Sequence, residues 1–198
     1  MNISMRYISR VQHEYHHPVG YVILGLLILG EQTLYSLKKN FEAGISLFYS
    51  ASVGSIKRAL DALLSQGLVR MTNQDGGPRG KKTYAITEAG RAEFQHWMRS
   101  PLTASDAETT ALARTFFLGL VEPADQAATL AAIIARMEED LQRLSTFALH
   151  LDALDVPPEA QPIFVHQRAT LDYGIGAHEF ALAWFRRHAA TVEQSEGE

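Results

Sequence analysis

Residues 50–87 read SASVGSIKRALDALLSQGLVRMTNQDGGPRGKKTYAIT, and this stretch decides the fold of the first half of the chain. Ser52 can cap a helix, because its hydroxyl can accept from a free backbone N–H of the first turn. Gly67 is typical of the residue that follows the end of a helix. Between them, a buried helix face is predicted by apolar residues at helical spacing, namely Ile56, Leu60, Leu63 and Leu64.

A two-stranded ribbon is predicted directly after this helix. Residues 68–72 and 81–87 read as short strands, and residues 74–80 between them hold three glycines and one proline, which favour a loop. The polar face of the helix carries Lys57 and Arg58, and the ribbon and its loop also contain basic residues. A basic helix followed by a basic ribbon is typical of the recognition helix and wing of a winged helix-turn-helix.

Several motifs of this stretch resemble the PadR family of bacterial transcriptional regulators. They are Gly54-Ser55-Ile56, Ala59-Leu60, Gly67-Leu68-Val69 and Tyr84-x-Ile86-Thr87-Glu88-x-Gly90-Arg91. The chain is more similar still to the larger-tailed, AphA-like subfamily, closely over residues 19–100 and more loosely through Trp97 and Leu171–Trp184. The resemblance implies a regulator that binds double-stranded DNA as a homodimer.

One departure from the family pattern concerns the recognition helix. The family usually has tyrosine after Gly-Ser-Ile, and this chain has Lys57. A contact between a tyrosine hydroxyl and a phosphate would therefore be replaced by a contact between lysine and phosphate.

Composition narrows the class of protein. The chain has 198 residues and is 46% hydrophobic, which is enough to bury a sizeable core and argues against disorder. The absence of cysteine excludes disulfides and thiolate metal sites and suits the cytoplasm. The apolar segment Tyr21–Leu29 is much too short to span a bilayer, so we expect a buried first helix and no membrane association.

Charge is divided unevenly along the chain. Residues 1–101 hold 12 Lys/Arg and 7 Asp/Glu, a net charge of +5, whereas residues 102–198 hold 6 and 15, a net charge of −9. The overall charge of −4 therefore conceals a basic half. This asymmetry is typical of a nucleic-acid-binding domain joined to an acidic partner domain.

The predicted fold is mainly α, a winged helix followed by a C-terminal helical dimerisation domain with antiparallel long helices. We expect an N-terminal extension at residues 1–18, the winged helix at 19–101, the dimerisation domain at 102–190 and a disordered tail at 191–198. In the first domain, Thr33 is expected to cap a second helix that runs to Ala43, and Thr87 a fourth helix that reaches Trp97 and Met98.

Two long helices are predicted in the C-terminal domain. Pro123 fits the first turn of one helix, and Pro157-Pro158 separates it from the next. The first helix carries an uninterrupted heptad seam, Ala127, Leu130, Ile134, Met137, Leu141, Leu144, Ala148 and Leu151. The predicted dimerisation residues are taken from the two seams: Leu130, Ile134, Met137, Leu141, Leu144, Leu171, Ile175, His178 and Leu182.

DNA contacts are predicted from the placement of basic and polar side chains. The first turns of a recognition helix reach base edges or phosphates, and a basic loop beside it can hold the backbone. The second helix can add phosphate contacts. The predicted DNA-binding residues are Tyr35, Lys38, Lys39, Ser52, Ser55, Lys57, Arg58, Arg79, Lys81 and Lys82.

Three other interpretations remain beside this one. His13-Glu14-Tyr15-His16-His17 matches the H-E-x-x-H zinc motif, but Pro18 prevents a helix from continuing, so we predict no metal site, no cofactor and no enzyme activity. The family resemblance implies that Trp97 can line a pocket for a small-molecule effector. The leading alternative to DNA binding is a winged helix that serves as a protein-interaction module, which the charge of the wing opposes.

Overall fold

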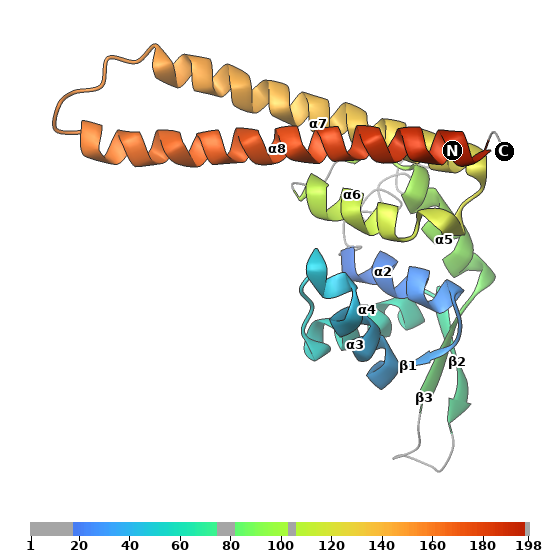
Figure 1. Ribbon diagram of the computed structural model, residues 1–198. Coiled ribbons are helices and arrows are strands. Elements are labelled where there is room, and N and C mark those ends of the chain that lie inside the picture. Colours follow the sequence, from blue (N-terminus) through green and yellow to red (C-terminus); the bar gives the residue numbers. More distant parts are fainter. Residues whose placement is uncertain (1–17, 75–81, 103–105, 197–198) are drawn as a thin grey trace, which may run out of the picture. The chain divides into compact units, whose positions relative to one another are not determined.

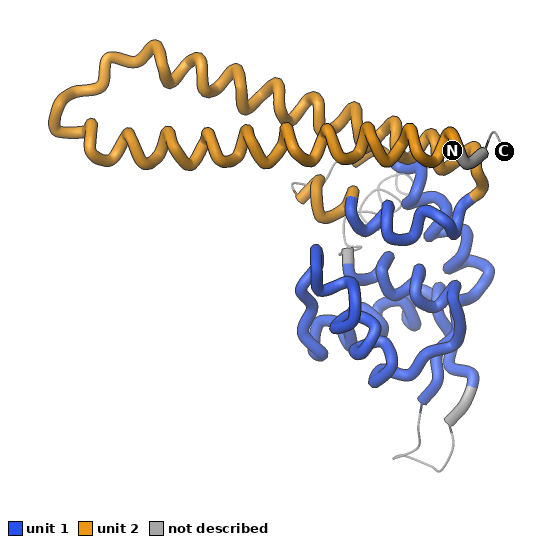
Figure 2. Tube along the Cα trace, viewed as in Figure 1, with its two compact units in different colours: residues 1–100, 112–121 blue, residues 101–111, 122–198 orange. Residues whose placement is uncertain are grey.

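The computed structural model describes residues 18–74, 82–102 and 106–196. They form two compact units (Figure 2). Unit 1 comprises the described residues up to Ser100 together with Leu112–Val121, and unit 2 comprises those of 101–111 and from Glu122 onward. The sequence analysis assigned residues 112–121 to the C-terminal domain, whereas they belong to unit 1.

Aromatic packing explains why residues 112–121 belong to unit 1. The ring of Phe117 is 2% exposed and meets Phe94 edge to face, with ring centroids 6.0 Å apart. The same ring covers the backbone of Gly25, where an added Cβ would lie 2.8 Å from it. Residues 112–121 therefore join unit 1, because the ring of Phe117 is buried against α2 and α5, although residues 101–111 before them belong to unit 2.

Unit 1 is a winged helix (Figure 1). β1, β3 and β2 form an antiparallel three-stranded sheet in that order, and β2 and β3 are the strands of the wing. The fold of this unit is therefore as predicted. Its elements are α2 (Pro18–Ile28), β1 (Gln32–Thr33), α3 (Leu34–Ala43), the 3-10 helix η1 (Ile45–Leu47), α4 (Val53–Ser65), β2 (Val69–Gln74), β3 (Lys82–Ile86), α5 (Glu88–Arg99), the end of α6 (Ala107–Phe116) and the 3-10 helix η3 (Leu118–Leu120).

Local hydrogen bonds set the helix boundaries of unit 1. Gly67 has a φ of 71° and follows the end of α4, as predicted. The three predicted N-cap side chains each accept from the backbone N–H three residues on: Thr33 from Ser36, Ser52 from Ser55 and Thr87 from Gly90. The sequence located these helix starts correctly because a cap depends on neighbouring residues alone.

A close contact at Gly90 joins α4, the wing and α5. The carbonyl oxygen of Leu68, just after α4, accepts from the backbone N–H of Thr87 at 3.0 Å. The hydroxyl proton of Thr87 is shared between this oxygen at 3.0 Å and the carbonyl oxygen of Gly67 at 2.7 Å. A Cβ at position 90 would lie 2.1 Å from the carbonyl oxygen of Leu68. Glycine is therefore the residue that lets the first turn of α5 reach the start of β2.

Unit 2 is built around an antiparallel pair of helices, α7 (Pro123–Asp152) and α8 (Gln161–Glu196), as predicted (Figure 1). Pro123 occupies the first turn of α7. None of the described helices is both long and apolar enough to cross a membrane.

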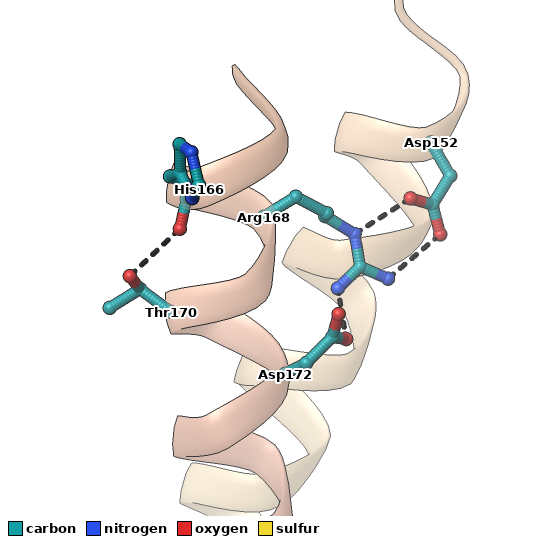
Figure 3. A network of polar contacts seen from close by, with 5 residues as sticks. All are labelled: Asp152, His166, Arg168, Thr170 and Asp172. Carbon is teal, nitrogen blue, oxygen red and sulfur yellow. Dashed lines mark hydrogen bonds and ion pairs between the residues drawn. The ribbon is translucent and has the colours of Figure 1, made fainter. Parts of the chain in front are cut away.

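Two ion pairs connect α7 and α8. Near the connecting loop, Arg168 of α8 donates to both carboxylate oxygens of Asp152 at 2.7 and 3.0 Å and also to Asp172 (Figure 3). Farther along the pair, Arg186 of α8 donates to Glu138 of α7 at 2.5 Å.

The heptad seam of α7 lies mostly within the chain. Leu130 and Met137 are 1% exposed, and Ala148 is 6% exposed. The half-buried members of the seam are Ile134, Leu141, Leu144 and Leu151, and Ala127 is exposed within one chain. The buried stripe instead begins at Thr129 and Leu130 and includes Ile133 and Asp140.

The predicted disorder from Thr191 is wrong for the residues that the structure describes. α8 continues without interruption to Glu196. Residues 191–196 contain neither proline nor glycine, so nothing in their sequence ends the helix.

The contact at Gly90 gives a stability prediction. Gly90→Ala should lower the free energy of unfolding by about 1–3 kcal/mol, because the methyl group collides with backbone that cannot move aside. Gly20→Ala in α2 is the matched control, since its added Cβ would come no closer than 3.9 Å to Leu63. It should leave stability unchanged or raise it by up to about 1 kcal/mol. Urea unfolding compares the two variants, and equal values would contradict this explanation.

Candidate nucleic-acid interface

The recognition helix α4 has a buried face and a polar face. Ile56, Leu60 and Leu63 are at most 2% exposed and anchor the helix in unit 1. On the other side, Lys57 and Arg58 are exposed. Exposed cations on a helix with an anchored apolar face can reach phosphates or base edges.

Hydrogen bonds at the start of α4 limit what the two predicted serines can offer. Ser52 Oγ accepts from the backbone N–H of Ser55 at 3.1 Å and donates to Ser55 Oγ at 3.3 Å. Ser55 Oγ donates in turn to the carbonyl oxygen of Ser52 at 2.8 Å. Both hydroxyl protons are therefore engaged, and the remaining capacity of these side chains is to accept, for example from the exocyclic amine of adenine or cytosine.

Lys57 and Arg58 differ in their partners. The ammonium of Lys57 lies 2.6 Å from Asp61 Oδ2, one turn later, and this hydrogen bond raises the pKa of Lys57. Among the described residues, no ion pair involves Arg58. Arg58 is thus the cation of α4 most available for a new partner.

The predicted contacts of α3 are partly occupied within the helix. Lys38 lies 3.3 Å from Glu42, four residues on. The ammonium of Lys39 lies over the ring of Tyr35, 5.0 Å from its centroid, and Tyr35 itself is 64% exposed. These are exposed, weak interactions that a phosphate can replace.

The wing is described only in part. Lys82 is exposed at the start of β3, paired in register with Gln74 of β2. Arg79 and Lys81, both predicted to bind DNA, lie outside the described residues, and so does the cluster from His13 to His17.

Trp97 is enclosed by other side chains. It is 7% exposed, with Tyr21 stacked on it at 4.7 Å between ring centroids and 6° between planes. The guanidinium of Arg114 lies over the ring, 5.2 Å from its centroid. The hydroxyl of Tyr21 also donates to Glu93 at 3.0 Å, so Trp97 belongs to the core of unit 1.

Arg114 is a buried cation that the sequence analysis missed. It is 1% exposed and donates to the carbonyl oxygen of Ser100 at 2.6 Å and to the Ser100 hydroxyl at 2.9 Å. Burial lowers the pKa of Arg114 to about 10. The sequence offered no signal for this role, because the ring of Trp97 and the carbonyl of Ser100 that accommodate the charge lie in α5 and at its end, not next to Arg114 in the sequence.

Two family models match the chain. Residues 23–96 match the transcriptional regulator PadR-like family, and residues 110–193 match the virulence activator alpha C-terminal family. The first match contains α4 and the wing, and the second contains nearly all of α7 and α8.

Similar proteins are named as regulators. "Probable transcriptional regulator Rv1176c" of Mycobacterium tuberculosis is 29% identical over 170 residues, which cover 81% of this chain and 89% of that protein. "Negative transcriptional regulator PadR" of Bacillus subtilis is 33% identical over 79 residues, covering 39% of this chain and 43% of that protein. The crystal structure of Bacillus subtilis PadR in complex with operator DNA is 21% identical, with coverage of 89% and 99% and a TM-score of 0.38.

The families and relatives confirm the prediction of a transcriptional regulator rather than an enzyme. The chain therefore combines a PadR-like domain with a C-terminal domain of the virulence activator type, and it is similar to the transcriptional regulators that carry these domains.

Proposed function

We propose that the chain is a sequence-specific DNA-binding regulator that binds an inverted-repeat operator as a homodimer. α4 reads the major groove, and the basic wing holds the phosphate backbone. The observation that carries this proposal is the polar face of α4, where Arg58 is exposed and has no ion pair among the described residues. A regulator of this kind acts in the cytoplasm, where bacterial DNA is found.

The distribution of charge supports DNA over a protein partner. The half of the sequence that contains the winged helix has a net charge of +5, whereas the other half has −9. Binding to phosphates depends on such a local excess of lysine and arginine. A wing used to bind another protein would more often be apolar.

Exposed apolar side chains on α7 and α8 support a dimer. Several large side chains are more than half exposed, which is costly for a helix pair in water. The exposed fractions are 52% for Phe147, 72% for Leu149, 64% for Ile163, 79% for Tyr173 and 68% for Phe180. A second copy of the helix pair would cover them.

The predicted dimerisation residues divide into two groups. Leu130, Met137 and Leu182 are at most 6% exposed within one chain, so their side chains already serve its core. The half-buried members are the ones that a partner can still contact: Ile134, Leu141, Leu144, Leu171, Ile175 and His178.

An effector pocket at Trp97 stays a prediction. Tyr21 and Arg114 cover the two rings of Trp97 in the described structure. An effector that reached Trp97 would have to displace one of these side chains. Arg114, which donates to Ser100 and has no ion pair among the described residues, would then offer its positive charge to an anionic compound.

Base readout and backbone contact can be separated with two variants. Arg58→Ala should weaken operator binding by about 1–3 kcal/mol and relax the preference at one base pair in each half-site. Lys82→Ala should weaken binding to operator and scrambled duplexes alike and reduce the salt slope by about 1 per protomer, which is about 2 for the dimer. Fluorescence anisotropy on both duplexes at one salt concentration tests this. If Arg58→Ala weakens both duplexes equally, Arg58 contacts phosphate and not a base.

A substitution at Leu141, a half-buried residue of the α7 seam, tests the dimer. Leu141→Asp should abolish dimerisation and operator binding while the winged helix stays folded, because a charge in an apolar interface loses its hydration. Gln142→Asp adds the same charge at an exposed neighbour and should leave the dimer intact. Sedimentation at micromolar concentration measures both, with circular dichroism as the check on folding. A monomeric wild type would contradict the proposal.

A further inference from the structure

Asp61 is an acidic side chain on the polar face of the recognition helix. It lies one turn after Lys57 and holds the ammonium of that lysine at 2.6 Å. The two side chains are 54% and 62% exposed, so the pair is not needed to neutralise a buried charge. Exposed pairs of this kind contribute little to stability, so folding does not explain why Asp61 lies on this face.

The charges of Asp61 and Lys57 both act on Tyr84 of β3. Burial, and then the negative charge of Asp61, raise the pKa of Tyr84 in β3, whereas Lys57 lowers it. Both charges therefore lie near the Tyr84 hydroxyl. Arg58 is one residue further around the helix and has no ion pair among the described residues. Two neighbouring cations on one helix are thus in different states: one is held, and one is available.

We infer that Asp61 is a specificity-determining residue that restrains Lys57 and thereby weakens binding to non-operator DNA more than binding to the operator. This inference rests on the proposed DNA-binding function. It assigns Asp61 a role by repulsion, since an interface can gain specificity by penalising the wrong partner as well as by attracting the right one.

Non-specific binding is the state that such a restraint affects most. Binding to arbitrary DNA comes almost entirely from phosphate contacts, so it is weakened when one lysine has to exchange its own carboxylate partner for a phosphate. In addition, the carboxylate of Asp61 repels phosphates that approach α4.

The operator can compensate for this loss through a base. Asp61 uses Oδ2 for Lys57, and no described hydrogen bond involves Oδ1. A carboxylate oxygen in the major groove can accept from the N4 amine of cytosine. Asp61 therefore adds an attraction only where the sequence presents a cytosine, and elsewhere it adds a penalty.

The test compares full-length wild type, Asp61→Asn, Lys57→Gln and the double variant on operator and scrambled duplexes across a salt series. Asp61→Asn should tighten scrambled-duplex binding by roughly 3- to 10-fold at about 0.1 M salt and steepen the salt slope of the dimer by up to about 1.8, the value of one phosphate contact in each protomer. Operator affinity should change by less than about twofold, so discrimination falls. In the Lys57→Gln background, the same change should leave the slope unaltered.

Glu159→Gln is the matched control. Glu159 is exposed in the loop before α8, so this variant makes the same change of net charge in unit 2 and should alter neither affinity nor slope. An unchanged slope in Asp61→Asn, an equal steepening without Lys57, or an equal gain on both duplexes would overturn the inference. If wild type binds neither duplex, the proposed function itself fails, which is a separate outcome.

Discussion

The carbonyl oxygen of Leu68 is the point on which the geometry of unit 1 depends. It accepts from the backbone N–H of Thr87 and shares the Thr87 hydroxyl with the carbonyl oxygen of Gly67, and it lies so close to Gly90 that no side chain fits there. Thr87 in turn caps α5. One carbonyl therefore sets the end of the recognition helix, the close of the wing and the start of the next helix relative to one another. The basic side chains of α4 and Lys82 of β3 are held in a fixed relation because these three elements are joined.

Local rules explain most of what the sequence predicted correctly. Ser52, Thr87 and Gly67 are signals that act within one turn, so they identified the recognition helix and its neighbours without any tertiary information. The wing followed from glycine and proline between two short strands, and the site was predicted from basic residues placed on these elements. The i, i+4 spacing of Lys57 and Asp61 was also visible, but it did not show by itself that the ammonium is held.

Tertiary packing explains what the sequence could not show. Residues 112–121 join unit 1 because Phe117 packs on α2 and α5, and their own periodicity gives no hint of that. The burial of Arg114 beneath Trp97 depends on a ring supplied by another helix. The seam of α7 suggested a dimer interface, yet the side chains of Leu130 and Met137 are already buried within one chain. Heptad spacing predicts a partner helix but does not say which chain provides it.

The salt dependence of DNA binding is the most direct measurement of whether the winged helix holds a phosphate backbone. It needs wild-type protein, DNA from the promoter region of the gene that encodes it, and a series of salt concentrations. A dimer that makes about 6–10 phosphate contacts should lose roughly 10³–10⁵-fold in affinity between about 50 and 200 mM salt. An affinity that stays constant over this range would contradict the electrostatic role assigned to α4 and the wing.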